Sequence, residues 1–159
     1  MKTKHVSVVI LYAPDKKILL QERGGISKSG EEWAFFGGKI EDGETKEQAA
    51  IREIKEELNF ELKNTNYLGQ VSGIVTDLTG NQKNLVEEVF ITKISSDLSQ
   101  FKLGEGIGMK LFTLTEARKL KIVPVDFKAL DLRAHTVNKK TDPRLVCLTL
   151  EELKKHHGH

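Results

Sequence analysis

The stretch GKIEDGETKEQAAIREIKEELNF, residues 38–60, carries the clearest pattern in this chain of 159 residues. Thr45 with Gln48 three positions later matches a capping box, so we expect a helix over residues 45–58. With about 100° of rotation per residue and Glu53 set at zero, Glu57 lies near roughly +40° and Glu56 near about −60°. The three carboxylates are therefore expected to share one face of the helix.

A neighbouring face of this helix is predicted to be apolar. Ile54, Leu58 and Ile51 fall between about +100° and +160° on the same scale, so this face should anchor the helix to the core. Two carboxylates about 5 Å apart in a cleft repel by roughly 3 kcal/mol at an effective dielectric of 20. A hard divalent cation would offset this repulsion, and oxygen ligands favour Mg²⁺, with Mn²⁺ as a substitute. A solvated acidic face is the alternative, since like charges on an exposed helix cost only about 0.2–0.5 kcal/mol.

The spacing of the fixed residues resembles the Nudix box. From Gly38, five residues lead to Glu44, and seven more lead to Arg52-Glu53-Ile54-Lys55-Glu56-Glu57. The box reads Gly-x5-Glu-x7-Arg-Glu-U-x-Glu-Glu-x-Gly-U, in which U is a bulky aliphatic residue. Asn59 stands at the usual glycine, and aromatic Phe60 at the last position. Asn readily adopts the left-handed conformation of a helix end, so we expect the cap to be kept.

The resemblance to MutT-like Nudix enzymes implies roles for residues of the box. Arg52 and Glu44 would brace the loop-helix-loop, and Glu53 would act as general base, with Glu105 of a downstream loop as the alternative. Glu87 and Glu88 are further candidates for the downstream acid, and because they are neighbours in a predicted strand they should point in opposite directions. The expected catalytic residues are Glu53, Glu105 and Arg52; the expected metal ligands are Gly37, Glu53, Glu56, Glu57 and Glu105.

Substrate contacts are expected on both sides of the box. Arg23 closes a strand and would meet a phosphate, the alternative being a solvated charge. Phe35 and Phe36 should alternate faces, one stacking on a base and the other filling the core. Asp126 resembles in position a base-reading residue of MutT-like proteins. The expected substrate-binding residues are Arg23, Phe35, Gly38, Lys39 and Asp126.

Hydrophobic patterning predicts a mixed order of strands and helices. Strands are expected at 5–13, 18–22, 33–36, 66–77, 85–94 and 109–113, and helices at 45–58, near 115–118 and at 125–134. The first two strands should form a hairpin around Pro14–Lys17. The fold class expected is α+β, an α/β/α sandwich. Residues 1–137 would form the Nudix domain, and residues 138–159 a C-terminal extension or tail with an element over 145–155.

The composition limits the binding partners and the cellular compartment that we expect for the protein. Lys and Arg number 25 against 23 Asp and Glu, so the net charge of +2 gives no support to nucleic-acid coating. The first apolar run is too short to span a membrane. Cys147 is the only cysteine, which excludes an internal disulfide and favours a reducing cytoplasm. We expect a small nucleotide-type substrate, no nucleic acid polymer, no membrane, and a monomer or homodimer.

The expected activity is Mg²⁺-dependent hydrolysis of a nucleoside diphosphate linkage. A nucleoside triphosphate, oxidised or otherwise non-standard, is the first choice of substrate, and its products would be a monophosphate and pyrophosphate. A nucleotide sugar or a dinucleoside polyphosphate is the alternative substrate. A non-catalytic nucleotide-sensing module is the competing class, which retention of Glu53, Glu56 and Glu57 disfavours.

Overall fold

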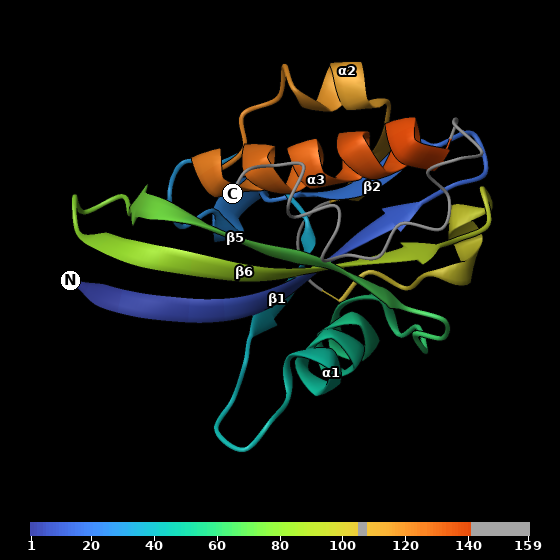
Figure 1. Ribbon diagram of the computed structural model, residues 1–159. Coiled ribbons are helices and arrows are strands. Elements are labelled where there is room, and N and C mark those ends of the chain that lie inside the picture. Colours follow the sequence, from blue (N-terminus) through green and yellow to red (C-terminus); the bar gives the residue numbers. More distant parts are fainter. Residues whose placement is uncertain (105–107, 141–159) are drawn as a thin grey trace.

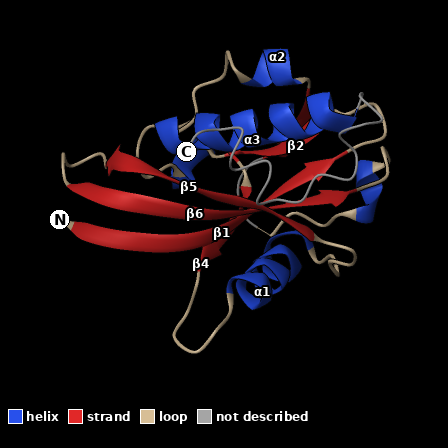
Figure 2. Ribbon diagram, viewed as in Figure 1, coloured by secondary structure: helices blue, strands red, loops and turns tan. Residues whose placement is uncertain are grey.

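The computed structural model describes residues 1–104 and 108–140, which form a mixed sheet between two helical layers (Figures 1 and 2). The strands are β1 (Lys2–Tyr12), β2 (Ile18–Glu22), β3 (Trp33–Ala34), β4 (Phe36–Lys39), β5 (Asn66–Thr76), β6 (Gln82–Lys93) and β7 (Gly108–Phe112). The helices are α1 (Lys46–Leu58), α2 (Leu114–Ala117) and α3 (Pro124–Lys140), with 3-10 turns η1 (Gly24–Ile26) and η2 (Leu98–Gln100). Because α1 covers one face of the sheet and α2 and α3 cover the other, the predicted α/β/α sandwich is confirmed.

Strand β1 lies inside the sheet because it is apolar on both faces. Val6, Val8 and Ile10 contribute to the cluster on the α3 side, whereas Val9 and Leu11 contribute to the cluster on the α1 side. Such a run of branched residues is typical of a strand covered on both faces. β1 pairs in parallel with β6 along its whole length, which fixes the relation between the first strand and a segment some 80 residues later.

The other edge of β1 is divided between two strands. Residues 36–39 of β4 run antiparallel to residues 6–9, whereas β2 meets β1 only where Tyr12 pairs with Ile18. The predicted hairpin of β1 and β2 is confirmed, since the Ala13 N–H donates to the Lys17 carbonyl oxygen at 2.9 Å beside the Tyr12 and Ile18 pair, but most of β2 pairs with β7 and its end with β3. β4 takes the middle of this edge, and it also packs against α1.

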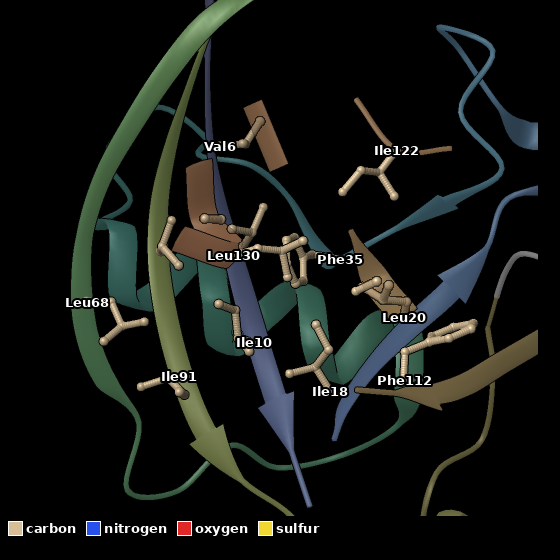
Figure 3. Close-up of a cluster of buried hydrophobic side chains, with 14 residues drawn as sticks. Val6, Ile10, Ile18, Leu20, Phe35, Leu68, Ile91, Phe112, Ile122 and Leu130 are labelled. Atoms are coloured by element: carbon tan, nitrogen blue, oxygen red, sulfur yellow. The ribbon is translucent and has the colours of Figure 1, made fainter. Parts of the chain in front are cut away.

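The core on the α3 side joins strands and helix in one cluster (Figure 3). Phe35, Ile10 and Leu130 point toward one another from a loop, a strand and a helix. Each fully buried side chain of this size contributes about 1.5–3 kcal/mol. Since Phe35 is part of this cluster, the segment just before β4 is held by the core itself.

Helix α3 is longer than the sequence predicted. A helix over 125–134 was the expectation, but α3 continues to Lys140, past the suggested domain boundary at residue 137. No proline or glycine occurs between Pro124 and Pro143, so nothing in the chain interrupts the helix there. Cys147 and the element expected over 145–155 lie outside the described residues. Across the described ranges, no helix has both the length and the apolar composition to cross a bilayer.

Candidate functional site

Helix α1 begins and ends where side chains and backbone satisfy its free polar groups. The Gln48 N–H donates to Thr45 Oγ1 at 3.0 Å, and the Thr45 N–H donates to Gln48 Oε1 at 2.9 Å. This is the predicted capping box. At the other end, Asn59 adopts the left-handed conformation, with φ 52°, and its N–H donates to the Lys55 carbonyl oxygen at 3.0 Å. The prediction that Asn59 keeps this cap is therefore confirmed.

The buried face of α1 includes one of the acids, which the sequence did not predict. Ile54 and Leu58 are fully buried, as expected, but Ile51 is 37% exposed. The expectation for Ile51 was wrong because the sheet covers an arc that includes Ala50 and Glu57 instead. Glu57 is only 5% exposed. A carboxylate in such a place is costly unless it is hydrogen bonded.

Two glycines of β4 meet two glutamates of α1. The Gly37 N–H donates to Glu57 Oε1 at 2.8 Å, which gives the buried carboxylate a partner. Gly38 faces Glu53, and a Cβ atom on Gly38 would lie 2.4 Å from the Glu53 carboxyl carbon. Only a residue without a side chain allows this approach. The β4 backbone therefore lies directly against both carboxylates.

Arg52 joins the loop before α1 to the acids on the helix. Its Nε and Nη2 donate to the two carboxylate oxygens of Glu44 at 2.7 and 2.9 Å, a bidentate pair. Nη1 donates to Glu53 Oε1 at 2.8 Å, and Nη2 also donates to the Lys39 carbonyl oxygen at 2.9 Å. Hydrogen bonds from Arg52 lower the pKa of Glu44 to about 2. These contacts suit the bracing role expected of Arg52 and Glu44.

The three acids expected to hold a metal differ in exposure. Glu57 is buried, the Glu53 side chain is 17% exposed, and the Glu56 side chain, 3.4 Å from Arg52, is 59% exposed. In the part of the chain that the structure describes, no three His, Cys, Asp or Glu side chains are grouped closely enough to hold an ion as they stand. The chemistry of the donors fits a hard divalent cation, because Glu53 and Glu57 offer carboxylate oxygens one helical turn apart, beside Gly38 and Gly37 respectively.

A pocket of about 440 Å³ begins at Gly37 and Gly38 and is lined by residues of several strands. This volume is typical of a small-molecule site, for which the usual range is about 300–1,000 Å³. Glu53 and Gly38 line one part of the pocket, and Phe35 and Asp126 line another. The structure brings all the expected substrate-binding residues to this pocket, namely Arg23, Phe35, Gly38, Lys39 and Asp126. Phe36 is fully buried on the α1 side, so the two phenylalanines alternate faces as predicted.

Arg23 is enclosed rather than solvated. Its Nε lies 3.3 Å from Glu31 Oε2, and its Nη1 donates to Gln21 Oε1 at 2.7 Å. Glu31 in turn accepts hydrogen bonds from Ser27 Oγ and from the Ser29 N–H, at 2.8 and 2.9 Å. Arg23 therefore fixes the loop that forms one wall of the pocket, and its charge is matched by Glu31.

Four lysines also line the pocket. They are Lys4, Lys28, Lys39 and Lys83. Burial, followed by repulsion from the other three lysines and from Arg23, lowers the pKa of Lys4. Among residues 1–104 and 108–140, no carboxylate lies within ion-pair distance of any of the four. Cations held close together without partners favour an anionic ligand.

Glu87 is a pocket residue to which the sequence assigned a different role. Both Glu87 and Glu88 were candidates for the downstream acid, and the prediction that they point in opposite directions is confirmed. Glu87 lines the pocket, whereas Glu88 accepts hydrogen bonds from Tyr67 Oη at 2.6 Å and Gln70 Nε2 at 2.7 Å, away from it. His5, to which the sequence gave no role, lies 2.5 Å from Glu88 through Nε2. Strand alternation alone could not say which glutamate faces the pocket.

Glu105 lies outside the described residues. Its neighbour Gly104 is described, and the Gly104 N–H donates to the Glu57 carbonyl oxygen at 2.6 Å. A Cβ atom on Gly104 would lie 2.6 Å from the Glu56 carbonyl oxygen. The chain just before Glu105 is therefore packed against the end of α1, and the role expected of Glu105 stays a prediction.

An α/β/α sandwich whose acidic helix follows a Gly-Gly strand defines a known class of protein. Residues 1–132 match the NUDIX domain family, so the chain belongs to this family. The resemblance of residues 38–60 to the Nudix box is thus confirmed.

The chain is also similar to individual members of this family. The 8-oxo-dGTP diphosphatase of Proteus vulgaris is 32% identical over 71 residues, which are 45% of this chain and 63% of that protein. The CTP pyrophosphohydrolase of Escherichia coli (strain K12) is 37% identical over 75 residues, which are 45% of this chain and 56% of that protein. The chain thus spans somewhat more than half the length of these relatives. In structure it is similar to the MutT protein from Methanosarcina mazei Go1, with a TM-score of 0.67 and 21% identity over 89% of this chain and 97% of the other.

Proposed function

We propose that this protein is a Mg²⁺-dependent hydrolase that converts a nucleoside triphosphate, oxidised or otherwise non-standard, into a nucleoside monophosphate and pyrophosphate. One observation carries the proposal: a single pocket connects Glu53 and Gly38 with Phe35 and Asp126. Glu53, through the bound metal ion, and the open backbone at Gly38 would meet the phosphates. Phe35 and Asp126 would meet the base. Relatives named for acting on 8-oxo-dGTP and on CTP support a triphosphate as substrate.

The residues around α1 would carry out the chemistry. A bound Mg²⁺ would neutralise charge on the phosphates and lower the pKa of a coordinated water. Its proposed ligands are the carboxylates of Glu53, Glu56 and Glu57 with the Gly37 carbonyl oxygen. Glu53 takes the proton of the water that attacks phosphorus, since it lines the pocket and Arg52 holds it in one orientation. The P–O bond that joins the α- and β-phosphates then breaks, so that a nucleoside monophosphate and pyrophosphate are released.

The rest of the pocket would position the nucleotide. The face of Phe35 provides a flat apolar wall for the base, and Asp126 an acceptor for its polar edge. Lys39, next to Gly38, carries a charge suited to a phosphate oxygen, as does Arg23. Holding both ends of the substrate fixes the scissile linkage beside Glu53, which is a main source of rate enhancement.

Replacement of the acids tests this assignment. We expect Glu53→Gln and Glu57→Gln each to lower kcat by at least about 100-fold, because an amide is a poor metal ligand and no base. Thermal unfolding should stay near that of the wild type for Glu53→Gln. Glu47→Gln, on the exposed first turn of α1, is the matched control and should keep full activity.

A panel of nucleotides with identification of the products tests the reaction itself. Nucleoside triphosphates, nucleotide sugars and dinucleoside polyphosphates are incubated with Mg²⁺, and separately with EDTA. We expect triphosphates to yield monophosphate and pyrophosphate only with the metal. Absence of Mg²⁺-stimulated turnover on every phosphoanhydride, or wild-type rates for both glutamine variants, would overturn the proposal.

A further inference from the structure

One row of residues across the sheet contacts α1 at two separate points. Ser7 of β1 pairs with Gly38 of β4 on one side and with Glu88 of β6 on the other. Gly38 faces Glu53, whereas Ser7 and Glu88 face Lys46, the first residue of α1. The row that carries a glycine of the candidate site therefore also carries the contacts to the start of the helix.

Ser7 holds the backbone of Lys46. The Ser7 side chain is fully buried, and its Oγ donates to the Lys46 carbonyl oxygen at 2.6 Å. A buried hydroxyl is costly without such a partner, so the bond opposes any movement of the first turn away from β1. Because the acceptor belongs to the helix backbone, the bond fixes the position of the turn itself and not only of a side chain.

Glu88 and Tyr67 hold the side chain of the same residue. Lys46 Nζ lies 4.0 Å from Glu88 Oε1 and 3.9 Å from the centroid of the Tyr67 ring. Burial raises the pKa of Glu88, but hydrogen bonds from Tyr67, Gln70 and His5 outweigh burial and lower this pKa below its usual value. Glu88 is therefore an anion, and the ammonium group of Lys46 is attracted both to it and to the face of the ring.

The position of Lys46 determines where Glu53 lies over Gly38. Lys46 and Glu53 are seven residues apart, so they lie about two turns and roughly 10 Å apart on the same side of α1. A shift of the first turn is carried along the helix to Glu53, whereas Gly38 stays with the sheet because β4 pairs with β1. A displacement of about 1 Å at a reacting group can cost about 100-fold in rate.

We infer that Ser7 and Lys46 are positioning residues, which together with Glu88 seat the first turn of α1 on the sheet and so set the distance between Glu53 and Gly38. The described residues that line the pocket include neither Ser7 nor Lys46, so both act through the helix. The effect of this seat on turnover rests on the proposed function. Its effect on the contact between α1 and β4 does not, and can be measured without turnover.

Hydrogen exchange of the Gly37 amide, followed by NMR in the free protein, tests the seat directly. The Gly37 N–H donates to Glu57 Oε1 from β4 to α1, so its protection reports how closely the helix lies on the strand. We expect Ser7→Ala to accelerate this exchange by about 3- to 10-fold. Thr92→Val is the matched control, since it removes a buried hydroxyl that bonds Thr65 in the loop before β5 instead of α1.

The control should leave the exchange of the Gly37 amide as it is in the wild type. Exchange at the wild-type rate in Ser7→Ala, or equal acceleration in Ser7→Ala and Thr92→Val, would overturn the inference.

Steady-state kinetics separate positioning from a loss of folded protein. Ser7→Ala should lower kcat by about tenfold and change KM by less than about twofold, because Ser7 does not meet the substrate. The Lys46 side chain is half exposed, so its variants should fold. Lys46→Met removes the charge and should lower kcat by about 2- to 5-fold. Lys46→Arg keeps a cation toward Glu88 and over Tyr67, and should retain most of the activity.

Two kinetic results would refute the seat. One is an unchanged kcat in Ser7→Ala, and the other is a loss of kcat in Lys46→Arg as large as that in Lys46→Met.

The outcomes also distinguish this inference from the proposed function. Faster exchange at Gly37 in Ser7→Ala, in a protein that hydrolyses no phosphoanhydride, would overturn the activity and leave the seat of α1 standing. Mg²⁺-dependent hydrolysis with wild-type exchange and wild-type kcat in Ser7→Ala would do the reverse.

Discussion

Arg52 is the residue on which the arrangement of the acids depends. It is bidentate to Glu44, and the same guanidinium reaches Glu53 and the Lys39 carbonyl oxygen. A lysine carries the same charge as a compact group without the planar fork. Geometry rather than charge therefore explains why an arginine suits this position.

We expect Arg52→Lys to lower kcat by about 10- to 100-fold, the usual effect of losing a residue that orients a ligand or base. KM should change little, because Arg52 does not line the pocket. Steady-state kinetics of the variant give both values. Arg118→Lys is the control: Arg118 forms a surface ion pair with Asp131 at 2.7 Å, and its substitution should leave kcat unchanged. A rise in KM with an unchanged kcat would argue against an orienting role for Arg52.

At the scale of elements, the end of α1 depends on a left-handed residue. Asn59 has φ 52°, and a residue with an ordinary side chain pays about 1–2 kcal/mol in this conformation. We expect Asn59→Ala to lower the free energy of unfolding by about 1 kcal/mol, and Asn59→Gly to leave it within about 0.5 kcal/mol of the wild type. Urea denaturation measures both. An alanine variant as stable as the glycine variant would contradict the role of the cap.

The two glycines of β4 should respond differently to the same substitution. A Cβ atom on Gly37, at φ 149°, would lie 2.1 Å from the Ser7 carbonyl oxygen, so Gly37→Ala should cost at least about 2 kcal/mol of stability. On Gly38 the clash is with the end of the Glu53 side chain, which can move. Gly38→Ala should therefore stay folded and lose about 10- to 100-fold in kcat. Urea denaturation and steady-state kinetics of both variants measure these effects. A fully active Gly38→Ala variant would contradict the close approach of Gly38 to Glu53.

Local sequence predicted the elements best where a local interaction decides them. The capping box at Thr45 and the cap at Asn59 involve neighbours in the chain, and both are as predicted. The prediction that Ile51 is buried was wrong, because packing and not the helical period determines which part of the helix surface the sheet covers. The main partner of β2 is likewise set at long range, since β2 pairs along its whole length with β7.

At the scale of the whole molecule, the pocket joins segments that the sequence could only consider separately. The Nudix box pointed to Glu53 and Gly38, and the resemblance pointed to Asp126. The loop before β3 brings Glu31 to the pocket. The parallel pairing of β6 with β1 determines that Glu87 faces the pocket. Neither is expressed in the spacing of nearby residues, so only the folded chain shows that these carboxyls share a pocket.

Charge is also arranged at this scale, in a way that the net charge of +2 conceals. Lys4 and Lys83 come from adjacent strands of the sheet, and both line the pocket together with Lys28 and Lys39. Lys93, at the other end of β6, is exposed. Clustered cations around a pocket raise the local concentration of anionic substrates, an effect that salt screens.

We expect the double variant Lys4→Gln, Lys83→Gln to raise KM for a triphosphate by about tenfold and to leave kcat near that of the wild type, because neither lysine lies in the α1 machinery. The increase of KM with added salt should also become shallower, since fewer charges remain to be screened. Kinetics from low to moderate salt measure both effects. The double variant Lys63→Gln, Lys93→Gln removes the same charge from exposed positions outside the pocket and is the control. Equal changes in the two double variants would mean that total charge acts and that the position of the lysines in the pocket does not.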